Sequence, residues 1–172
     1  MKLRIRDDYI PTVPRVDAVG AWGDKMKQLT LLILISMLLF SASTSNARNT
    51  IQHFSIEQAL ARGEAEGKIK SSVQLFFGDQ AHPQVEQELA TVSANRKTNA
   101  FGKSDESACQ WAFLSAMITL QDRAIASGGD AVINIRSYYY QNAFTSATEF
   151  ECGAGAAIAG VTMVGEVVKL VD

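Results

Sequence analysis

The pattern of hydrophobic and polar positions in the last two thirds of the chain predicts two helices. The shorter covers residues 56–66 and follows the capping-box pattern Ser55-Ile-Glu-Gln58, which satisfies free backbone N–H groups at a helix start. The longer covers residues 105–126 and is apolar over more than half of its circumference. Gly128-Gly129 ends it. A helix this broadly apolar is expected to pack on more than one side.

Alternating apolar and polar positions predict strands at residues 71–77 and 131–139, and a further strand begins near 149–152. The last strand, at 161–171, is apolar on both faces, which is typical of a central strand. Strand 71–77, helix 105–126 and strand 131–139 fit one right-handed crossover unit. The expected fold class is α+β, with one long and one short helix packed on a small three- to four-stranded sheet.

Residues 80–103 show the weakest pattern. A short helix over 84–92 and a polar, turn-rich loop over 93–102 are expected there. Long ordered loops in small domains often carry function, so loop 80–103 is a candidate for binding a small ligand or metal. The alternative is a mobile connection without such a role.

The N-terminal region predicts export. Lys25 and Lys27 bracket Met26, a run of about a dozen mostly apolar residues follows from Leu29 to Phe40, and small polar residues end at Ala47. This is the layout of a secretory signal peptide, with cleavage between Ala47 and Arg48. A membrane-spanning helix needs roughly 20 apolar residues, so an anchor helix is the weaker alternative.

Residues 1–25 have no periodicity and form a polar leader that signal peptides rarely carry. Translation is therefore expected to start at Met26, which makes 1–25 a misplaced extension, 26–47 the signal peptide and 48–172 one secreted domain. No cysteine follows the apolar run, so a lipid anchor is not expected, nor any stable membrane anchor after cleavage. The predicted location is periplasmic or secreted.

The predicted export affects what is expected of the two cysteines, Cys109 and Cys152. In an oxidising compartment an even pair is expected to form a disulfide. The bridge would close a loop of about 43 residues and stabilise the domain by roughly 3–4 kcal/mol. The alternative is two buried free thiols.

Charge argues against nucleic acid as a partner. Residues 48–172 carry 10 Lys and Arg against 14 Asp and Glu, a net charge of −4, without a basic stripe. Neutralisation of phosphates supplies most non-specific affinity for nucleic acids, and this composition does not provide it.

Motifs for cofactors are incomplete. Phe101-Gly-Lys-Ser104 resembles the end of a phosphate-binding loop, but Lys97 stands where the first glycine is needed. Gly153-Ala-Gly155 is half of a dinucleotide fingerprint, and Ile158 stands at the third glycine. Neither cofactor is expected.

Catalytic and metal sites have no assigned residues. His53 and His82 are isolated from other metal-ligating residues, so no metal site is expected. No catalytic motif is present, which favours a non-enzymatic role.

Aromatic residues give the candidate recognition surface. In Tyr138-Tyr139-Tyr140, alternate side chains point to opposite faces of the strand, so one or two should be exposed. The expected surface consists of Arg136, Tyr138, Tyr140 and Phe144. The alternative is packing of an edge strand against residues 141–148.

Three segments, residues 97–116, 128–140 and 151–155, resemble a family of short secreted bacterial proteins that carry the label "excinuclease ATPase subunit". The resemblance covers nearly all of the secreted domain. The labelled role needs Walker motifs, zinc-binding cysteine clusters and a cytoplasmic location, whereas this chain has an export signal and two cysteines. The label is therefore interpreted as a misnomer.

A looser similarity links helix 105–126, Gly129-Asp-Ala-Val132 and strand 161–171 to YbjQ-like and RcsF-like small domains. The RcsF resemblance implies an envelope sensor with a lipid anchor and two disulfides, and this chain matches neither feature. The leading hypothesis is a periplasmic, non-enzymatic module that binds an envelope protein partner. The alternatives are a small-ligand or metal-binding protein and, least favoured, the excinuclease ATPase.

Overall fold

The computed structural model describes residues 48–171, and both predicted helices are present in it. Helix α2 (Ile56–Ala65) begins where the Ser55 hydroxyl accepts a hydrogen bond from the Gln58 backbone N–H, at 3.2 Å. Helix α3 (Asp105–Ala126) begins in the same way at Ser104. The predictions for residues 1–47, which include the extension, the signal peptide and Ala47 at its cleavage site, lie outside the described residues.

The sheet has seven strands, so the predicted three- to four-stranded sheet is wrong. The strands are β1 (Asn49–Ser55), β2 (Gln74–Phe77), β3 (Val85–Asn99), β4 (Ala131–Tyr139), β5 (Asn142–Phe144), β6 (Glu149–Gly155) and β7 (Ile158–Leu170). Three of them, β1, β3 and β5, were not predicted. β1 is mostly polar and β5 has three residues, so neither shows a long apolar alternation.

The expected loop 80–103 is mostly the 15-residue strand β3, and the expected helix at 84–92 is wrong as well. β3 pairs antiparallel with β7 from Val85 opposite Leu170 to Asn99 opposite Ile158. Only Val92 and Ala94 are buried, and their neighbours face solvent. A strand with one such small buried face has too few apolar residues to be recognised by its sequence pattern. The hypothesis that a long loop at residues 80–103 binds a ligand or metal therefore has no such loop to rest on.

Strand β7 is central, as its two apolar faces predicted. The order is β1-β6-β7-β4-β2, with β3 also paired to β7 and β5 to β4. β2 and β4 are neighbouring parallel strands, as expected for the ends of a crossover, and the other pairs are antiparallel.

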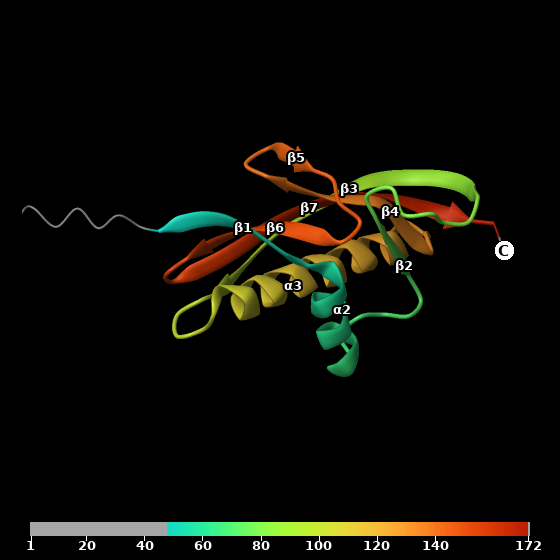
Figure 1. Ribbon diagram of the computed structural model, residues 1–172. Helices are drawn as coiled ribbons and strands as arrows, with labels where there is room; N and C mark the ends of the chain where they lie inside the picture. The colour runs from blue at the N-terminus through green and yellow to red at the C-terminus, as the bar shows by residue number, and fades with distance from the viewer. Residues whose placement is uncertain (1–47, 172) are drawn as a thin grey trace, which may run out of the picture. The chain divides into compact units, whose positions relative to one another are not determined.

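Both helices lie on one side of the sheet, with α3 running along the strands and α2 packed beside α3 (Figure 1). The core between α3 and the sheet contains the aromatic rings of Phe77, Phe113 and Phe150, and the last two stack at 4.2 Å. Gln121 is fully buried, and its side chain hydrogen-bonds the backbone of Lys70 and Val73. These bonds fix the irregular segment that leads into β2.

The two cysteines lie together with the geometry of a disulfide, as predicted. Cys109 in the first turns of α3 and Cys152 on β6 are bonded, with an S–S distance of 2.06 Å, and both residues are fully buried. The bridge fastens α3 to the part of the sheet that carries β1 and β6, because Cys152 pairs with Gln52 in the β1–β6 register.

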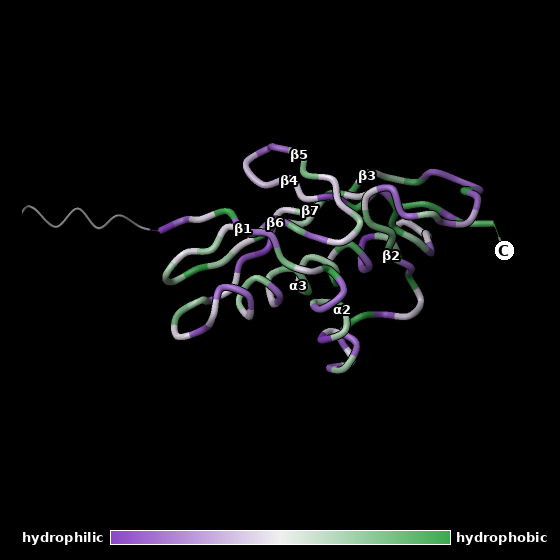
Figure 2. Tube along the Cα trace, in the orientation of Figure 1, coloured by the Kyte–Doolittle hydropathy of each residue, from purple (hydrophilic) through white to green (hydrophobic). Residues whose placement is uncertain are grey.

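The opposite face of the sheet is divided in two. At one end a small apolar cluster, made of Ala131, Ile133, Val168 and Leu170, packs against Phe76 and Val85, and the ring of His82 contacts Phe76. At the other end, no helix of residues 48–171 covers the sheet (Figure 1). Figure 2 shows the tip of the β4–β5 hairpin at this end in purple, because the turn is polar. No helix within residues 48–171 is long and apolar enough to cross a bilayer.

Candidate functional site

The β4–β5 hairpin, in the open part of the sheet, has a turn with an unusual backbone conformation. Its turn consists of two residues, Tyr140 and Gln141, with φ angles of +49° and +64°. Two-residue hairpin turns with two positive φ angles favour Asn-Gly, because bulky side chains are strained in the left-handed region. Each such residue costs of order 1–3 kcal/mol of stability. A third positive φ, at Asn134, marks an irregularity in β4 before the hairpin.

Two of the three tyrosines are exposed. The exposed fraction is 65% for Tyr140 and 38% for Tyr138. The Asn49 side-chain N–H donates to the Tyr140 hydroxyl at 2.7 Å, which links the tip of the hairpin to the start of β1. The aromatic side chain is thus held in place rather than left free.

Tyr139 is half-buried and lies on Gly153 of β6. A Cβ atom added to Gly153 would stand 1.9 Å from the Tyr139 hydroxyl oxygen, so only glycine leaves room for this ring. Burial, and then the neighbouring Tyr140, raise the pKa of Tyr139. The rings of Tyr139 and Tyr140 meet edge to face at 4.6 Å. Tyr139 therefore supports the exposed ring of Tyr140 from below.

A shallow cleft of about 300 Å³ adjoins the three tyrosines. Its other lining residues are neutral or basic: Asn95, Lys97, Gln141, Gly160 and Thr162. The cleft offers hydroxyl, amide and ammonium groups and aromatic edges. It has no carboxylate or imidazole to act as a general base beside them.

Arg136 lies on the same face of β4 as Tyr138, but its guanidinium is already engaged. It is 4.0 Å from a Glu166 carboxylate oxygen and donates to the Asn134 carbonyl at 3.2 Å. The Asn134 side chain in turn donates to Glu166 at 2.8 Å. This network stiffens the strand next to the tyrosines.

Phe144 does not line the cleft. It packs against the imidazole of His53 on β1, with ring centroids 4.5 Å apart, and His53 lies 3.5 Å from a Glu151 carboxylate oxygen. Of the four residues predicted to form a recognition surface, Tyr138 and Tyr140 line the cleft. Arg136 and Phe144 do not line it.

Sequence reasoning missed Asn49, Lys97, Gly153 and Gly160 at this site. β1 and β3 were not predicted, so nothing placed Asn49 or Lys97 beside the tyrosines. The run of small residues at 153–160 was the one available sign, since glycine in a strand often marks close approach of another group.

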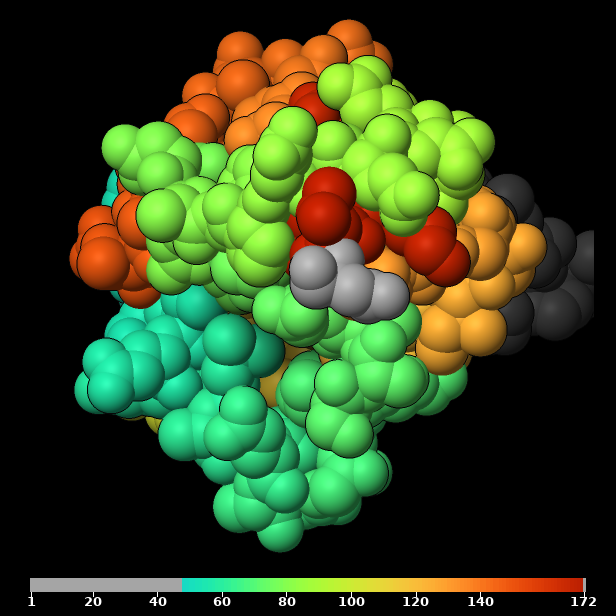
Figure 3. Space-filling model, turned by 90° about the vertical axis from the view of Figure 1, so that its right-hand side faces the viewer, coloured from blue at the N-terminus to red at the C-terminus, as the bar shows by residue number. Residues whose placement is uncertain are grey.

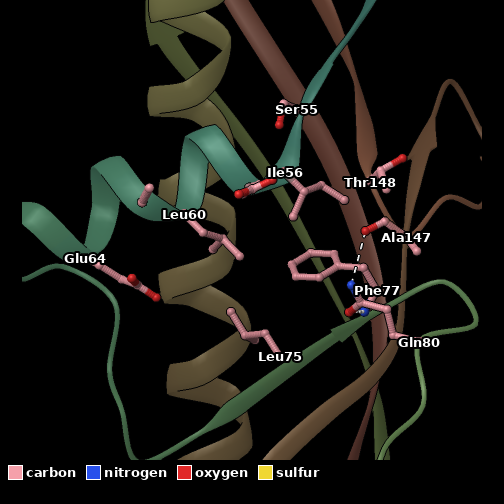
Figure 4. A pocket seen from close by; sticks show the side chains of 11 residues that line it. Ser55, Ile56, Leu60, Glu64, Leu75, Phe77, Gln80, Ala147 and Thr148 are labelled. Carbon is pink, nitrogen blue, oxygen red and sulfur yellow. Dashed lines mark hydrogen bonds between the residues drawn. The ribbon is translucent and has the colours of Figure 1, made fainter.

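A second concavity, a groove of about 610 Å³, lies between α2, β2 and residues 147–148 (Figure 4). Its walls are mixed: Ile56 and Leu60 on one side and Leu75 and Phe77 on the other are apolar, and polar residues lie among them. Gln80 closes one end, donating to the Ala147 carbonyl at 3.2 Å. Figure 3 shows the surface hollowed between α2, in teal, and the green segment that follows it.

Two carboxylates, Glu57 and Glu64, line this groove, and neither has an ion-pair partner within residues 48–171. They stand seven residues apart on one stripe of α2, about 10 Å along the helix axis. Leu60 and Ala61 lie between them. The groove therefore combines an apolar surface with unpaired negative charge.

The metal-ligating candidates stay apart. His82 contacts the Pro83 carbonyl and the ring of Phe76, far from His53 on β1. Within the described part of the chain, no group of three His, Cys, Asp or Glu residues is placed to hold a metal ion.

The stretch that resembles a phosphate-binding loop is a short turn. Lys97, at the position where that motif needs its first glycine, lies in β3 opposite Gly160. Phe101 and Gly102 form the turn that joins β3 to α3. The backbone therefore does not form the glycine-rich cradle that binds phosphate.

Comparison with known proteins identifies no relative: no family model, curated protein or solved structure matches this chain.

Proposed function

We propose that residues 48–172 form an extracytoplasmic, non-enzymatic module that binds a protein partner of the cell envelope. The binding surface is the tyrosine face, defined as Tyr138 and Tyr140 with the cleft that they line. Arg136 and Phe144 lie outside the cleft and contact Glu166 and His53.

One observation carries the proposal. Tyr140 is two-thirds exposed in a left-handed turn, where a tyrosine costs stability and contributes little to the core. Strain of this kind persists where the side chain has another use. Tyrosine is also among the residues most enriched at the centres of protein interfaces, because it combines a large apolar ring with a hydroxyl.

The disulfide and the predicted signal peptide support the location. A fully buried Cys109–Cys152 bridge fits an oxidising compartment outside the cytoplasm. The periplasm is the compartment that we infer. An excinuclease ATPase is disfavoured, because the chain has neither the phosphate-binding loop nor the cysteine clusters of that role.

Capture of partners from periplasmic extract tests the proposal. The bait is the protein purified from the periplasm, compared with Tyr138→Ala, Tyr140→Ala and the double variant. Ile125→Ala on α3 is the control, since Ile125 is also an exposed apolar residue, with 48% exposure, but lies outside the tyrosine face. We expect a protein captured by the wild type and Ile125→Ala and lost from the double variant. Capture that is absent, or unaffected by the tyrosine variants, would contradict the proposal.

The groove beside α2 favours a second candidate function, the binding of a small ligand. Four large apolar side chains and two unpaired carboxylates in its walls suit an organic cation with an apolar body. A diamine with an eight-carbon spacer matches the separation of Glu57 and Glu64.

A thermal-shift screen of metal ions and small ligands separates this candidate from protein binding. We expect a rise in melting temperature with 1,8-diaminooctane, a smaller rise with octan-1-amine and none with octanoate. Glu57→Gln and Glu64→Gln should remove the advantage of the diamine, whereas Glu106→Gln, in the first turn of α3, should not. If no ligand or metal raises the melting temperature, this second function is wrong.

A further inference from the structure

The end of the domain at which β1 begins carries an exposed apolar patch. Phe101, in the β3–α3 turn, is 79% exposed, the highest value among the exposed large hydrophobic residues of the described chain, and Ile158 is 57% exposed. The two turns are joined, because the Ala100 N–H donates to the Ala157 carbonyl at 2.9 Å. The apolar tip is defined as Phe101, Ala156, Ala157 and Ile158. Figure 1 shows both turns at the same end of the molecule as the start of β1.

The turn that presents Phe101 is well ordered by its hydrogen bonds. The Phe101 N–H donates to the Asn99 side-chain oxygen at 2.9 Å, and the Lys103 N–H donates to the Ala100 carbonyl at 3.1 Å. The Lys103 ammonium donates to the Asn99 carbonyl at 3.0 Å. The exposure of Phe101 is therefore built into the turn. Exposed large apolar residues on two joined turns are typical of an interaction site.

The charges around the tip differ from those of the domain. The domain carries a net charge of −4, yet Lys97, Lys103 and Arg48 lie at this end. Arg48 is paired with Asp105 at 2.6 Å, and Glu106 is the next acid along the chain. An aromatic ring beside lysines suits the interface of an anionic bilayer, which takes up the ring and attracts the cations.

The position of the tip along the chain points to the same partner. Asn49 pairs with Gly155, so the polypeptide that precedes the domain joins it directly beside the β6–β7 turn. That polypeptide contains the apolar run Leu29–Phe40. A domain exported behind such a signal would emerge at a membrane surface with this end foremost, until the predicted cleavage after Ala47.

We propose that the apolar tip is a reversible docking site for an anionic lipid surface. Phe101 and Ile158 enter the interfacial region, and Lys97 and Lys103 contact the headgroups. A single small apolar contact of this kind gives weak, salt-sensitive binding rather than an anchor. The docking site shares Lys97 with the cleft of the tyrosine face, but Phe101, Ile158 and Lys103 belong to the docking site alone, so variants of these three residues test it by itself.

Sedimentation with vesicles tests the docking site. The protein purified from the periplasm is mixed with vesicles of phosphatidylcholine alone, or with added phosphatidylglycerol. We expect binding to the anionic vesicles that decreases with salt. Phe101→Ser should weaken it about tenfold or more, and Lys103→Gln about fivefold. The control Ile125→Ser replaces an exposed apolar residue outside the tip and should bind as the wild type does.

Two results would overturn the proposal. One is wild-type protein that does not bind anionic vesicles, or that binds no better than Phe101→Ser. The other is a Phe101→Ser variant that loses capture of a soluble protein while vesicle binding is unchanged, which would make the tip a protein-binding site. The double variant Tyr138→Ala and Tyr140→Ala should bind vesicles normally, so failure here leaves the tyrosine face untouched.

Discussion

The two faces of the sheet are built on opposite principles. The face covered by α3 buries apolar side chains, ties the helix down with a disulfide and satisfies its buried amide, Gln121. The open end of the other face exposes Tyr138 on β4 and Tyr140 in a strained turn, and Tyr139 lies against a glycine. The first face accounts for stability. The second keeps a strained turn and exposed aromatic rings at a cost in stability, which is typical of a binding surface.

The largest expected effect lies on the covered face. Phe113 is fully buried and stacked on Phe150, so Phe113→Ala should lower the free energy of unfolding by about 3–5 kcal/mol. Tyr138→Ala on the open face should change it by less than about 1 kcal/mol. Urea denaturation measures both values, and similar losses at the two positions would remove the contrast between the faces.

The disulfide comes next. Replacement of Cys109 and Cys152 by alanine should lower stability by about 2–5 kcal/mol, because the unfolded chain loses a constraint on a loop of 43 residues. Mass spectrometry without reduction should show the two peptides linked in wild-type protein from the periplasm. Two freely alkylated thiols there would contradict both the bridge and the inferred location.

The buried amide has a smaller role. Gln121→Ala leaves the backbone groups of Lys70 and Val73 without their hydrogen bonds, and should cost about 1–3 kcal/mol. Hydrogen exchange should rise first in residues 68–73, which these bonds fix. Uniform exchange across the domain would show that Gln121 supports the whole fold instead.

On the open face one substitution should increase stability. Glycine adopts the left-handed region freely, so Gln141→Gly should raise the free energy of unfolding by about 1 kcal/mol. Gln141→Ala is the control and should give no gain. A loss of stability in the glycine variant would mean that the turn is not strained.

The smallest effect concerns pH. The pKa of Tyr139 is raised by burial and by Tyr140, so the neutral phenol favours the folded state. Its contribution is complete below the ordinary tyrosine pKa of about 10, and is lost as the pH rises through the higher folded-state pKa. Ultraviolet titration should show one tyrosine that ionises late, and Tyr139→Phe should remove it. The prediction is wrong if all tyrosines titrate together.

The covered face was largely predictable from the sequence, because apolar residues recur in its helix and strands with a clear period. Helix α3, strand β4 and the central strand β7 follow from their apolar periods, and the disulfide follows from the cysteine count and the export signal. The open face was not predictable to the same degree. β3 has only two buried side chains, Val92 and Ala94, and β1 is mostly polar, so neither stands out as a strand.

The tyrosine face shows why a site of this kind is hard to predict from sequence. Tyr138 and Tyr140 were identified from the sequence, but their surroundings depend on long-range pairing. Asn49 reaches Tyr140 across 91 positions of the chain, and Gly153 makes room for Tyr139 only because β6 lies beside β4. Local sequence patterns reveal neither of these two contacts.

Site-specific photo-crosslinking in living cells tests the central claim most directly. A benzoylphenylalanine placed at position 140 should give a discrete crosslinked product with one envelope protein, and the same probe at position 125 on α3 should not. No product at position 140, or the same products from both positions, would contradict the claim that the tyrosine face binds a partner.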